Sequence, residues 1–445
     1  MIKKLLGIVL VVVVVYGVSI TLFTQTQATL LALVALLVAL WTTEVLPLGV
    51  VSLLPIIMFP AFGILDTKMT TANYAHPIIY LFLGGFLIAI AVEKTQLHML
   101  IAHKVLTLFC ATPRGMIFSL ATTSALLSSI LSNTTTTLLL MPVALFLTTD
   151  AQLKMRFALA IAYGASIGGI LTPVGTPPNL ILMGIMDEYN LPSIAFFNWM
   201  VMVAPIVIVM LIGMGYTLSY GIKKQHIQTP HIDTVLTKAQ KKVLWVLGFL
   251  IVLLFLNAPI KPYWNGLGLS ESGILLGFGL LLFVPGFAIL EWKEDAHKIP
   301  YAIIFLFGAG FSIAKAFSYT HLAEAVAHYL ILLSTLDQLW LIVIVALLIT
   351  FTTEITSNTA LISIMLPVIY ALGEQTAIDT PLLMMVATVC ASYAFMLPIA
   401  TAPNAIAMSS GVVQVKDMIR FGFLLNLLGI GVIVLASLFF WPFFM

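Results

Sequence analysis

The sequence is dominated by long apolar runs that follow one another with only short polar connections. A transmembrane α-helix needs roughly 20 mostly apolar residues, and runs of about this length recur from residue 5 to residue 443. Only 8% of the residues are charged, against about 25% in ordinary soluble domains. Because so few charges cannot cover a surface exposed to water, the pattern predicts an all-α polytopic membrane protein. It excludes a soluble enzyme and a nucleic-acid-binding protein.

Eleven of these runs are predicted to cross the membrane, and two longer ones are predicted to be re-entrant hairpins. The hairpins are 115–149 and 339–373, since each exceeds one crossing and carries a polar cluster at its middle. The predicted spans are 5–23, 28–45, 47–64, 77–97, 155–185, 196–220, 242–258, 272–290, 300–319, 381–410 and 418–443.

Basic residues predict the orientation, because cytoplasmic loops accumulate Lys and Arg. Lys3 and Lys4 place the N-terminus in the cytoplasm, and the outer segments then keep only Lys68 and Lys261. This distribution requires the first hairpin to enter from the cytoplasm and the second from outside. The expected location is the inner (plasma) membrane of the cell, with the C-terminus outside.

An internal repeat runs through the chain at a fixed offset, which is 225 in residue number. The segment 132–134, Ser-Asn-Thr, recurs at 357–359, and the Pro-x-x-Thr-x-Pro-Asn pattern of 173–179 recurs at 398–404. The predicted topology makes the two copies inverted, as in many secondary transporters, whose sites lie near the midplane between the repeats. The predicted organisation is N-terminal scaffold helices (1–76), repeat 1 (77–220), a cytoplasmic loop with linking scaffold helices (221–298) and repeat 2 (299–445).

Each repeat carries two predicted breaks, a hairpin tip (131–135 or 356–360) and a proline-containing segment within a span (172–179 or 397–404). Proline interrupts a helix, and unwound backbone at membrane depth is tolerated where it lines a cavity. The N-termini of the helices after the breaks favour an anion, whereas the carbonyls before them suit Na⁺. No Lys or Arg lies in the breaks. We therefore expect an anion and Na⁺ to bind together.

The two Ser-Asn-Thr tips and the segment 392–406 (Ser-x-x-Phe-x-x-Pro-Ile-Ala-x-x-x-Asn-Ala-Ile) resemble the divalent anion:sodium symporter family of INDY-type dicarboxylate transporters. The resemblance implies a homodimer in which a transport domain moves against a scaffold domain as an elevator. The implied substrate-binding residues are Ser132, Asn133, Thr134, Thr176, Ser357, Asn358, Thr359 and Thr401. The implied sodium ligands are Ser128, Ser132, Asn133 and Gly175 in one site and Thr353, Thr356, Asn358 and Ala400 in the other, and further sodium sites are left open.

The expected function is sodium-coupled import of a C4-type dicarboxylate such as succinate, malate or fumarate. A sulfate, citrate or tartrate transporter and a sodium-independent dicarboxylate exchanger remain alternatives. An intramembrane enzyme is disfavoured, because the sequence has neither HExxH nor a pair of aspartates at membrane depth, and no catalytic residue is predicted. Glu354 has Ser129 as its repeat counterpart, which favours a structural role over a cation ligand. Glu44 and Lys315 are expected to serve the scaffold, paired with each other or reaching the interface.

Overall fold

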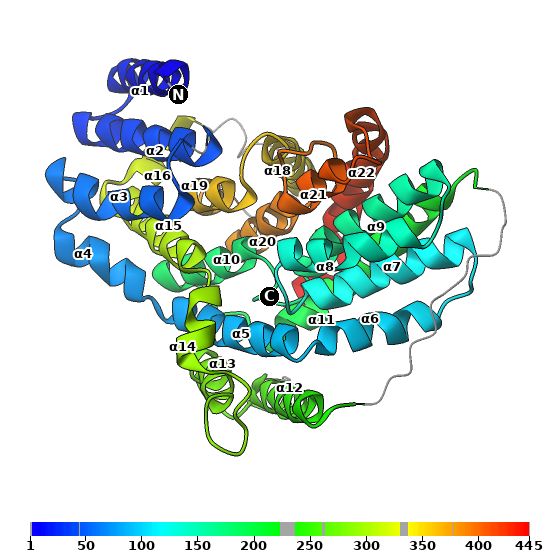
Figure 1. Ribbon diagram of the computed structural model, residues 1–445. Coiled ribbons are helices and arrows are strands. Elements are labelled where there is room, and N and C mark those ends of the chain that lie inside the picture. Colours follow the sequence, from blue (N-terminus) through cyan, green and yellow to red (C-terminus); the bar gives the residue numbers. More distant parts are fainter. Residues whose placement is uncertain are drawn as a thin grey trace.

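The computed structural model describes residues 2–43, 45–222, 236–259, 263–329, 337–376 and 378–444. Every regular element in these ranges is a helix, and the helices form a broad bundle (Figure 1). Glu44 and Lys261, which entered the sequence predictions, lie outside the described residues. The prediction of an all-α polytopic membrane protein is confirmed for the part of the chain that the structure describes.

Seven helices of the described chain are long and apolar enough to cross a membrane. They are α1 (Ile2–Leu22), α2 (Gln25–Thr43), α5 (Pro77–Lys94), α11 (Phe196–Ser219), α12 (Lys238–Asn257), α15 (Tyr301–Tyr319) and α22 (Val415–Phe439). The remaining four predicted spans correspond to shorter or interrupted helices, among them α3 (Leu48–Ala61). Short elements connect these, namely α4 (Thr67–Ala72), η1 (Asn73–Ala75), α14 (Trp292–Asp295), η2 (Ala296–Lys298) and η3 (Trp441–Phe443).

The predicted continuous span 272–290 is wrong in its second half. Helix α13 (Glu271–Leu281) ends after 11 residues, and turns follow it. Pro285 cannot donate a backbone hydrogen bond, and Gly286 has a φ of +94°, which no α-helix accommodates. The prediction from apolar composition made this helix too long, because composition alone does not reveal the break at the Pro-Gly pair.

The two hairpins and the two interrupted helices are present, and the helices that follow the breaks begin at the same offset. The hairpins are α7 (Pro113–Ser128) with α8 (Asn133–Phe146), and α18 (Gln338–Thr353) with α19 (Asn358–Gly373). The interrupted helices are α9 (Ala151–Gly169) with α10 (Pro177–Glu188), and α20 (Thr380–Ala391) with α21 (Ala402–Ser409). The first residues of α8 and α10 match those of α19 and α21 in the register of the sequence repeat, so the repeat in sequence is a repeat in structure.

The kinks after α5 and α15 are also duplicated, and they are held in the same way. Gln96 and His321 adopt left-handed conformations, with φ of 55° and 53°, before α6 (Leu97–Thr107) and α16 (Leu322–Tyr329). The Gln240 amide donates to the Thr95 carbonyl (3.1 Å), and the Gln27 amide donates to the Thr320 carbonyl (3.0 Å).

Both glutamines also close capping boxes at the N-termini of their helices, with Thr24 and Thr237 as partners. Gln27 and Gln240 are separated by fewer residues than the other equivalent positions of the two repeats. The inverted repeat therefore extends to α2 and α12 in a shifted register, which self-comparison at one offset cannot detect.

The helices pack as two groups. Helices α7–α11 and α18–α22 pack mainly on one another, whereas α1, α2, α3 and α15, and likewise α5, α12 and α13, pack outside that group. Contact between the groups is made chiefly by α10 and α19 against α15, and by α6 and α16 (Figure 1). The hairpins and interrupted helices thus form one body, with the predicted scaffold helices around it.

Candidate functional site

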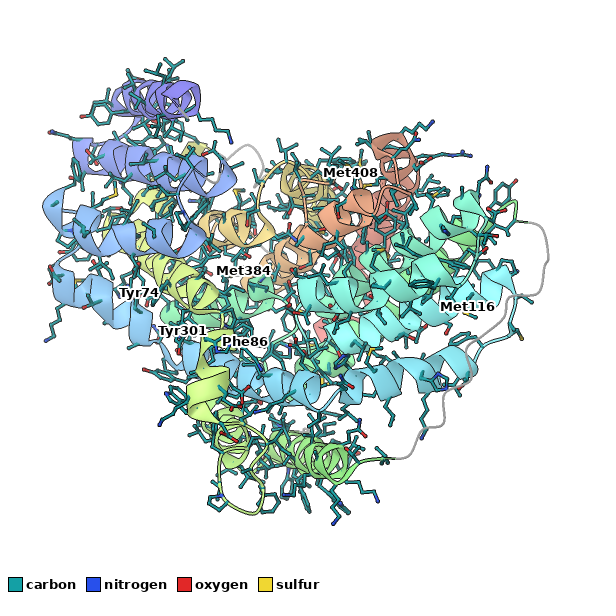
Figure 2. The ribbon with its side chains drawn as sticks, in the orientation of Figure 1. Tyr74, Phe86, Met116, Tyr301, Met384 and Met408 are labelled. Atoms are coloured by element: carbon teal, nitrogen blue, oxygen red, sulfur yellow. The ribbon has the colours of Figure 1, made fainter. Side chains whose placement is uncertain are left out.

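The breaks converge on one cavity of about 220 Å³. Both hairpin tips and both unwound segments contribute to its wall, and α5 and α15 close it on the side of the other group. Figure 2 labels Phe86, the α5 side chain that belongs to this wall. The lining residues are Phe82, Gly85, Phe86, Ile130, Leu131, Ser132, Asn133, Thr134, Val174, Gly175, Thr176, Pro177, Ile303, Ser357, Asn358, Thr359, Ala400, Thr401, Ala402 and Pro403. None of these lining residues carries a charge.

The structure brings all eight residues of the predicted substrate site together in this wall. Gly175 and Ala400 of the predicted sodium sites also line it. Ser128, Thr353 and Thr356 do not line the cavity. Ser128 and Thr353 end the first hairpin arms and contact the tip asparagines, whereas Thr356 lies in the second tip. The Thr356 hydroxyl donates to the Thr352 carbonyl (2.9 Å) and not to Asn358.

Behind each tip, a hydroxyl and an amide oxygen are held in direct contact. The Ser128 hydroxyl donates to Oδ1 of Asn133 at 2.5 Å, and the Thr353 hydroxyl donates to Oδ1 of Asn358 at 2.7 Å. Close packing reinforces the first pair, because a methyl group at Gly169 would lie 2.6 Å from the same Asn133 oxygen. Each pair offers two oxygens that a small cation can share once the hydroxyl proton turns away.

Four helix N-termini point to the cavity, since the N-cap and first residue of α8, α10, α19 and α21 all line it. Two of the N-cap hydroxyls are committed to their own helices. Ser132 accepts from the Thr135 amide (3.1 Å), and Thr401 accepts from the Asn404 amide (3.3 Å). Thr176 and Ser357 make no such cap. These two hydroxyls therefore remain available to a ligand, one from each repeat.

A buried asparagine fastens each unwound segment across its own bend. The Asn179 side-chain amide donates to the carbonyls of Gly169 (3.4 Å) and Thr172 (2.9 Å). The Asn404 amide donates to the carbonyls of Ala394 and Leu397, both at 3.0 Å. These carbonyls occupy matching positions of the two repeats. The sequence indicated both asparagines as repeat matches, but only the contacts reveal that they fix the bends.

Glu354 holds the second unwound segment from the hairpin. It is 3% exposed, and its carboxylate accepts from the backbone amides of Phe395 (2.8 Å), Met396 (2.9 Å) and Leu397 (3.0 Å). The Asn426 amide on α22 adds a fourth donor at 2.7 Å. The side chain is absent from the cavity wall, and its hydrogen-bonding capacity is used by the protein. These contacts support the structural role favoured from the sequence.

The apolar part of the wall was missed by sequence reasoning. Phe82 and Phe86 on α5 and Ile303 on α15 face the tips across the cavity. The available signal was the Gly-Phe pair that recurs at 85–86 and 310–311. Gly85 and Gly310 mark where the two groups approach closely, since a methyl group there would lie 3.2 Å from Val174 and 2.7 Å from Ser363.

Several known proteins are similar to this chain in sequence. The sequence profile of the citrate transporter family matches residues 38–389. A sodium-dependent dicarboxylate transporter, SdcS, of Staphylococcus saprophyticus is 30% identical, over 90% of this chain and 84% of that protein. SdcS of Staphylococcus aureus strain RF122 is 29% identical over the same shares. The chain belongs to the divalent anion:sodium symporter family.

Two solved transporter structures with lower sequence identity have a similar fold. MtrF of Neisseria gonorrhoeae, described with a class of antimetabolite efflux pumps, superposes with a TM-score of 0.60 at 13% identity, over 83% of each chain. The YdaH transporter of Alcanivorax borkumensis gives 0.58 at 16% identity, over 86% of this chain and 90% of its own. The symporter described here is thus a multi-pass membrane transporter and not an enzyme.

Proposed function

We propose that this symporter imports a C4-type dicarboxylate, such as succinate, malate or fumarate, coupled to Na⁺. The observation that carries the proposal is the uncharged cavity at which four helix N-termini and two Ser-Asn-Thr tips meet. An anion bound there has helix dipoles and backbone amides as its partners, but no cationic side chain. Co-bound Na⁺ supplies the missing positive charge. The names of the SdcS relatives, sodium-dependent dicarboxylate transporters, support the same coupling.

A small substrate with a carboxylate at each end fits the symmetry of the wall. Each repeat presents one uncommitted hydroxyl, Thr176 or Ser357, beside a helix N-terminus. A cavity of about 220 Å³ is smaller than the roughly 300–1,000 Å³ typical of pockets for drug-sized ligands. These features favour a four-carbon dicarboxylate over the larger tricarboxylate citrate.

We propose two pseudo-symmetric sodium sites, one behind each tip. The first would use Ser128, Ser132, Asn133 and the Gly175 carbonyl, with the short Ser128–Asn133 contact at its centre. In the second, Thr353, Thr356, Asn358 and the Ala400 carbonyl would be the ligands, around the Thr353–Asn358 contact. Binding would turn each hydroxyl proton away, so that oxygen lone pairs face the cation. Thr356 would have to leave its bond to Thr352 to take part.

Transport would proceed by movement of one helix group against the other. The group α7–α11 with α18–α22 would be the transport domain, and the remaining helices would be the scaffold domain, as in an elevator. The duplicated Gln27 and Gln240 contacts support fixed kinks at the scaffold end of each connection. In line with the family resemblance, we propose a homodimer in the inner membrane, with the N-terminus in the cytoplasm and the C-terminus outside.

Uptake into proteoliposomes tests the proposal. Labelled succinate should accumulate only with an inward Na⁺ gradient, and not with a matched K⁺ gradient. Unlabelled malate and fumarate should compete, whereas sulfate, citrate and tartrate should compete weakly. Succinate uptake that ignores Na⁺ contradicts the coupling and favours an exchanger. Absence of succinate uptake together with Na⁺-driven citrate or sulfate uptake contradicts the substrate assignment.

A further inference from the structure

At the end of α10, the proposed transport domain carries two adjacent acidic residues that contact the other helix group. Glu188, at the end of α10, pairs with Lys315 of α15 at 2.7 Å. Asp187 lies 3.3 Å from Nε2 of His76, the residue that precedes α5. Lys315 was expected to serve the scaffold, with Glu44 as one possible partner, but its partner in the described structure is Glu188 on the opposite body.

The helices that carry these pairs are in tight contact. A methyl group at Gly184 of α10 would clash with the ring of Phe311 on α15, and the centroid of that ring lies 4.6 Å from the centroid of the His76 ring. On α19, Ser363 lies against Gly310, where a methyl group would be 2.7 Å from its hydroxyl. This conformation therefore has one face of the moving body fully docked on α15.

The repeat identifies the equivalent face, which is bare in this conformation. Ser363 has Leu138 of α8 as its counterpart, and Val174, which packs on Gly85, has Ile399. Leu138 is 56% exposed and Ile399 is 74% exposed. Leu138 opens onto a mostly apolar groove of about 550 Å³ between α8 and α21, whose wall also contains Met141, Leu145 and Ile406, with Lys154 as its one charged residue. Large apolar side chains are thus uncovered where the repeat predicts contact.

The Glu188–Lys315 ion pair and the Asp187–His76 contact have no charged counterparts. In the register of the repeat, Glu188 and Lys315 correspond to Val413 and Ile90, and Asp187 and His76 correspond to Val412 and Tyr301. If the repeats exchange roles, Gly85 of α5 meets Leu138, Gly310 meets Ile399, and the ends of the moving body meet the scaffold through apolar side chains.

We propose that the pairs Glu188–Lys315 and Asp187–His76 form a latch that holds only the conformation described here. The opposite conformation docks the groove between α8 and α21 onto α5, and apolar contact takes the place of the two pairs there. This inference rests on the proposed alternating access. It adds that the two end states are stabilised by different chemistry, so that charge neutralisation shifts the equilibrium in one direction.

Single-cysteine reporters in the full-length protein test the latch, after replacement of Cys110 and Cys390 by alanine. Leu138→Cys should react with a maleimide in this conformation, and Ser363→Cys, which is fully buried, should react in the opposite one. Lys315→Met and Glu188→Gln should each slow labelling at 138 roughly fivefold and speed it at 363, as expected for loss of a partly exposed ion pair. The double swap Lys315→Glu with Glu188→Lys should restore the parent rates.

Matched controls separate the possible failures. Lys298→Met removes a partner of Asp295 within the scaffold group and should leave both reporters unchanged. If a single latch variant fails to fold, the charge swap and the pair His76→Asn and Asp187→Asn give the same measurement. Reporters that respond to Na⁺ with succinate but not to the latch variants overturn the latch alone. Reporters that fail to respond reciprocally to Na⁺ with succinate overturn the alternating access on which it rests.

Discussion

The two repeats hold their unwound segments in place with different hydrogen bonds. In the first repeat, the segment 170–176 is seven residues long, and the Thr172 hydroxyl donates to the Ser129 carbonyl on the hairpin at 2.5 Å. In the second, the segment 392–401 is ten residues long, and the Glu354 carboxylate, in the position of Ser129, accepts three of its amides. A longer break leaves more amides without helical partners, and a carboxylate satisfies several at once.

The repeats share the contacts of the proposed ion sites and the asparagine that braces each bend. The hydroxyl–amide contacts Ser128–Asn133 and Thr353–Asn358 correspond position by position, as do the bracing residues Asn179 and Asn404. The differences concern how the surrounding backbone is held. Symmetry is thus kept at the proposed ion sites and at the asparagine braces, and it is relaxed where the hairpins hold the unwound segments. Four measurements test this difference between the repeats.

The largest expected effect comes from the support that the repeats do not share. Glu354→Ala leaves three buried amides and Asn426 without an acceptor and should lower stability by about 3 kcal/mol or more. Ser129→Ala is the matched control, because its hydroxyl bonds only to the Leu126 carbonyl, and it should be nearly neutral. Thermal unfolding in detergent measures both. Equal losses in the two variants would mean that the supports are equivalent after all.

The next effect should be equal in the two repeats. Asn133→Ala and Asn358→Ala each remove the amide oxygen at a proposed sodium site, and each should weaken the apparent Na⁺ affinity by about tenfold or more. The Na⁺ dependence of succinate uptake measures this affinity. Wild-type Na⁺ dependence in both variants would refute the two sites, whereas loss in only one would refute their equivalence.

A smaller effect is expected at the two tip serines, whose replacement should cause different defects. Ser132 caps α8, so Ser132→Ala should lower stability by about 1 kcal/mol. Ser357 makes no cap, so Ser357→Ala should leave the melting temperature unchanged and weaken succinate binding by roughly fivefold. Unfolding and binding measurements on the same preparations separate these outcomes. A lower melting temperature for Ser357→Ala would contradict the assignment.

The smallest effect is expected at Gln27 of α2 and Gln240 of α12, the part of the repeat with a shifted register. Gln27→Ala and Gln240→Ala each remove the side-chain amide that holds a kink and part of a capping box, and each should lower stability by about 1 kcal/mol. The two losses should be similar, because both amides donate to the equivalent carbonyl, at 3.0 and 3.1 Å, and only Gln27 adds a second contact, to the His321 carbonyl at 3.2 Å. Clearly unequal losses would show that the kinks are not equivalent.

The helical class, the hairpins, the four breaks and the eight polar residues that line the cavity could all be predicted from the sequence. This is possible because a membrane requires long apolar helices, and interruptions at membrane depth must carry proline or polar residues. Both are local signals, and the internal repeat duplicates them in one register. The same local reasoning overextended the span at 272–290, where a Pro-Gly turn ends α13 early.

The hydrogen-bond and packing partners of these residues could not be predicted from the sequence. Glu354 meets amides 41 to 43 residues away, and Phe86 reaches the tips from another helix group. Lys315 pairs with Glu188 from 127 residues away. Such contacts depend on how helices dock, and docking is set by the packing of whole surfaces, which no local pattern records. The exposed Leu138 and Ile399 depend in the same way on which of the two docked states the chain adopts.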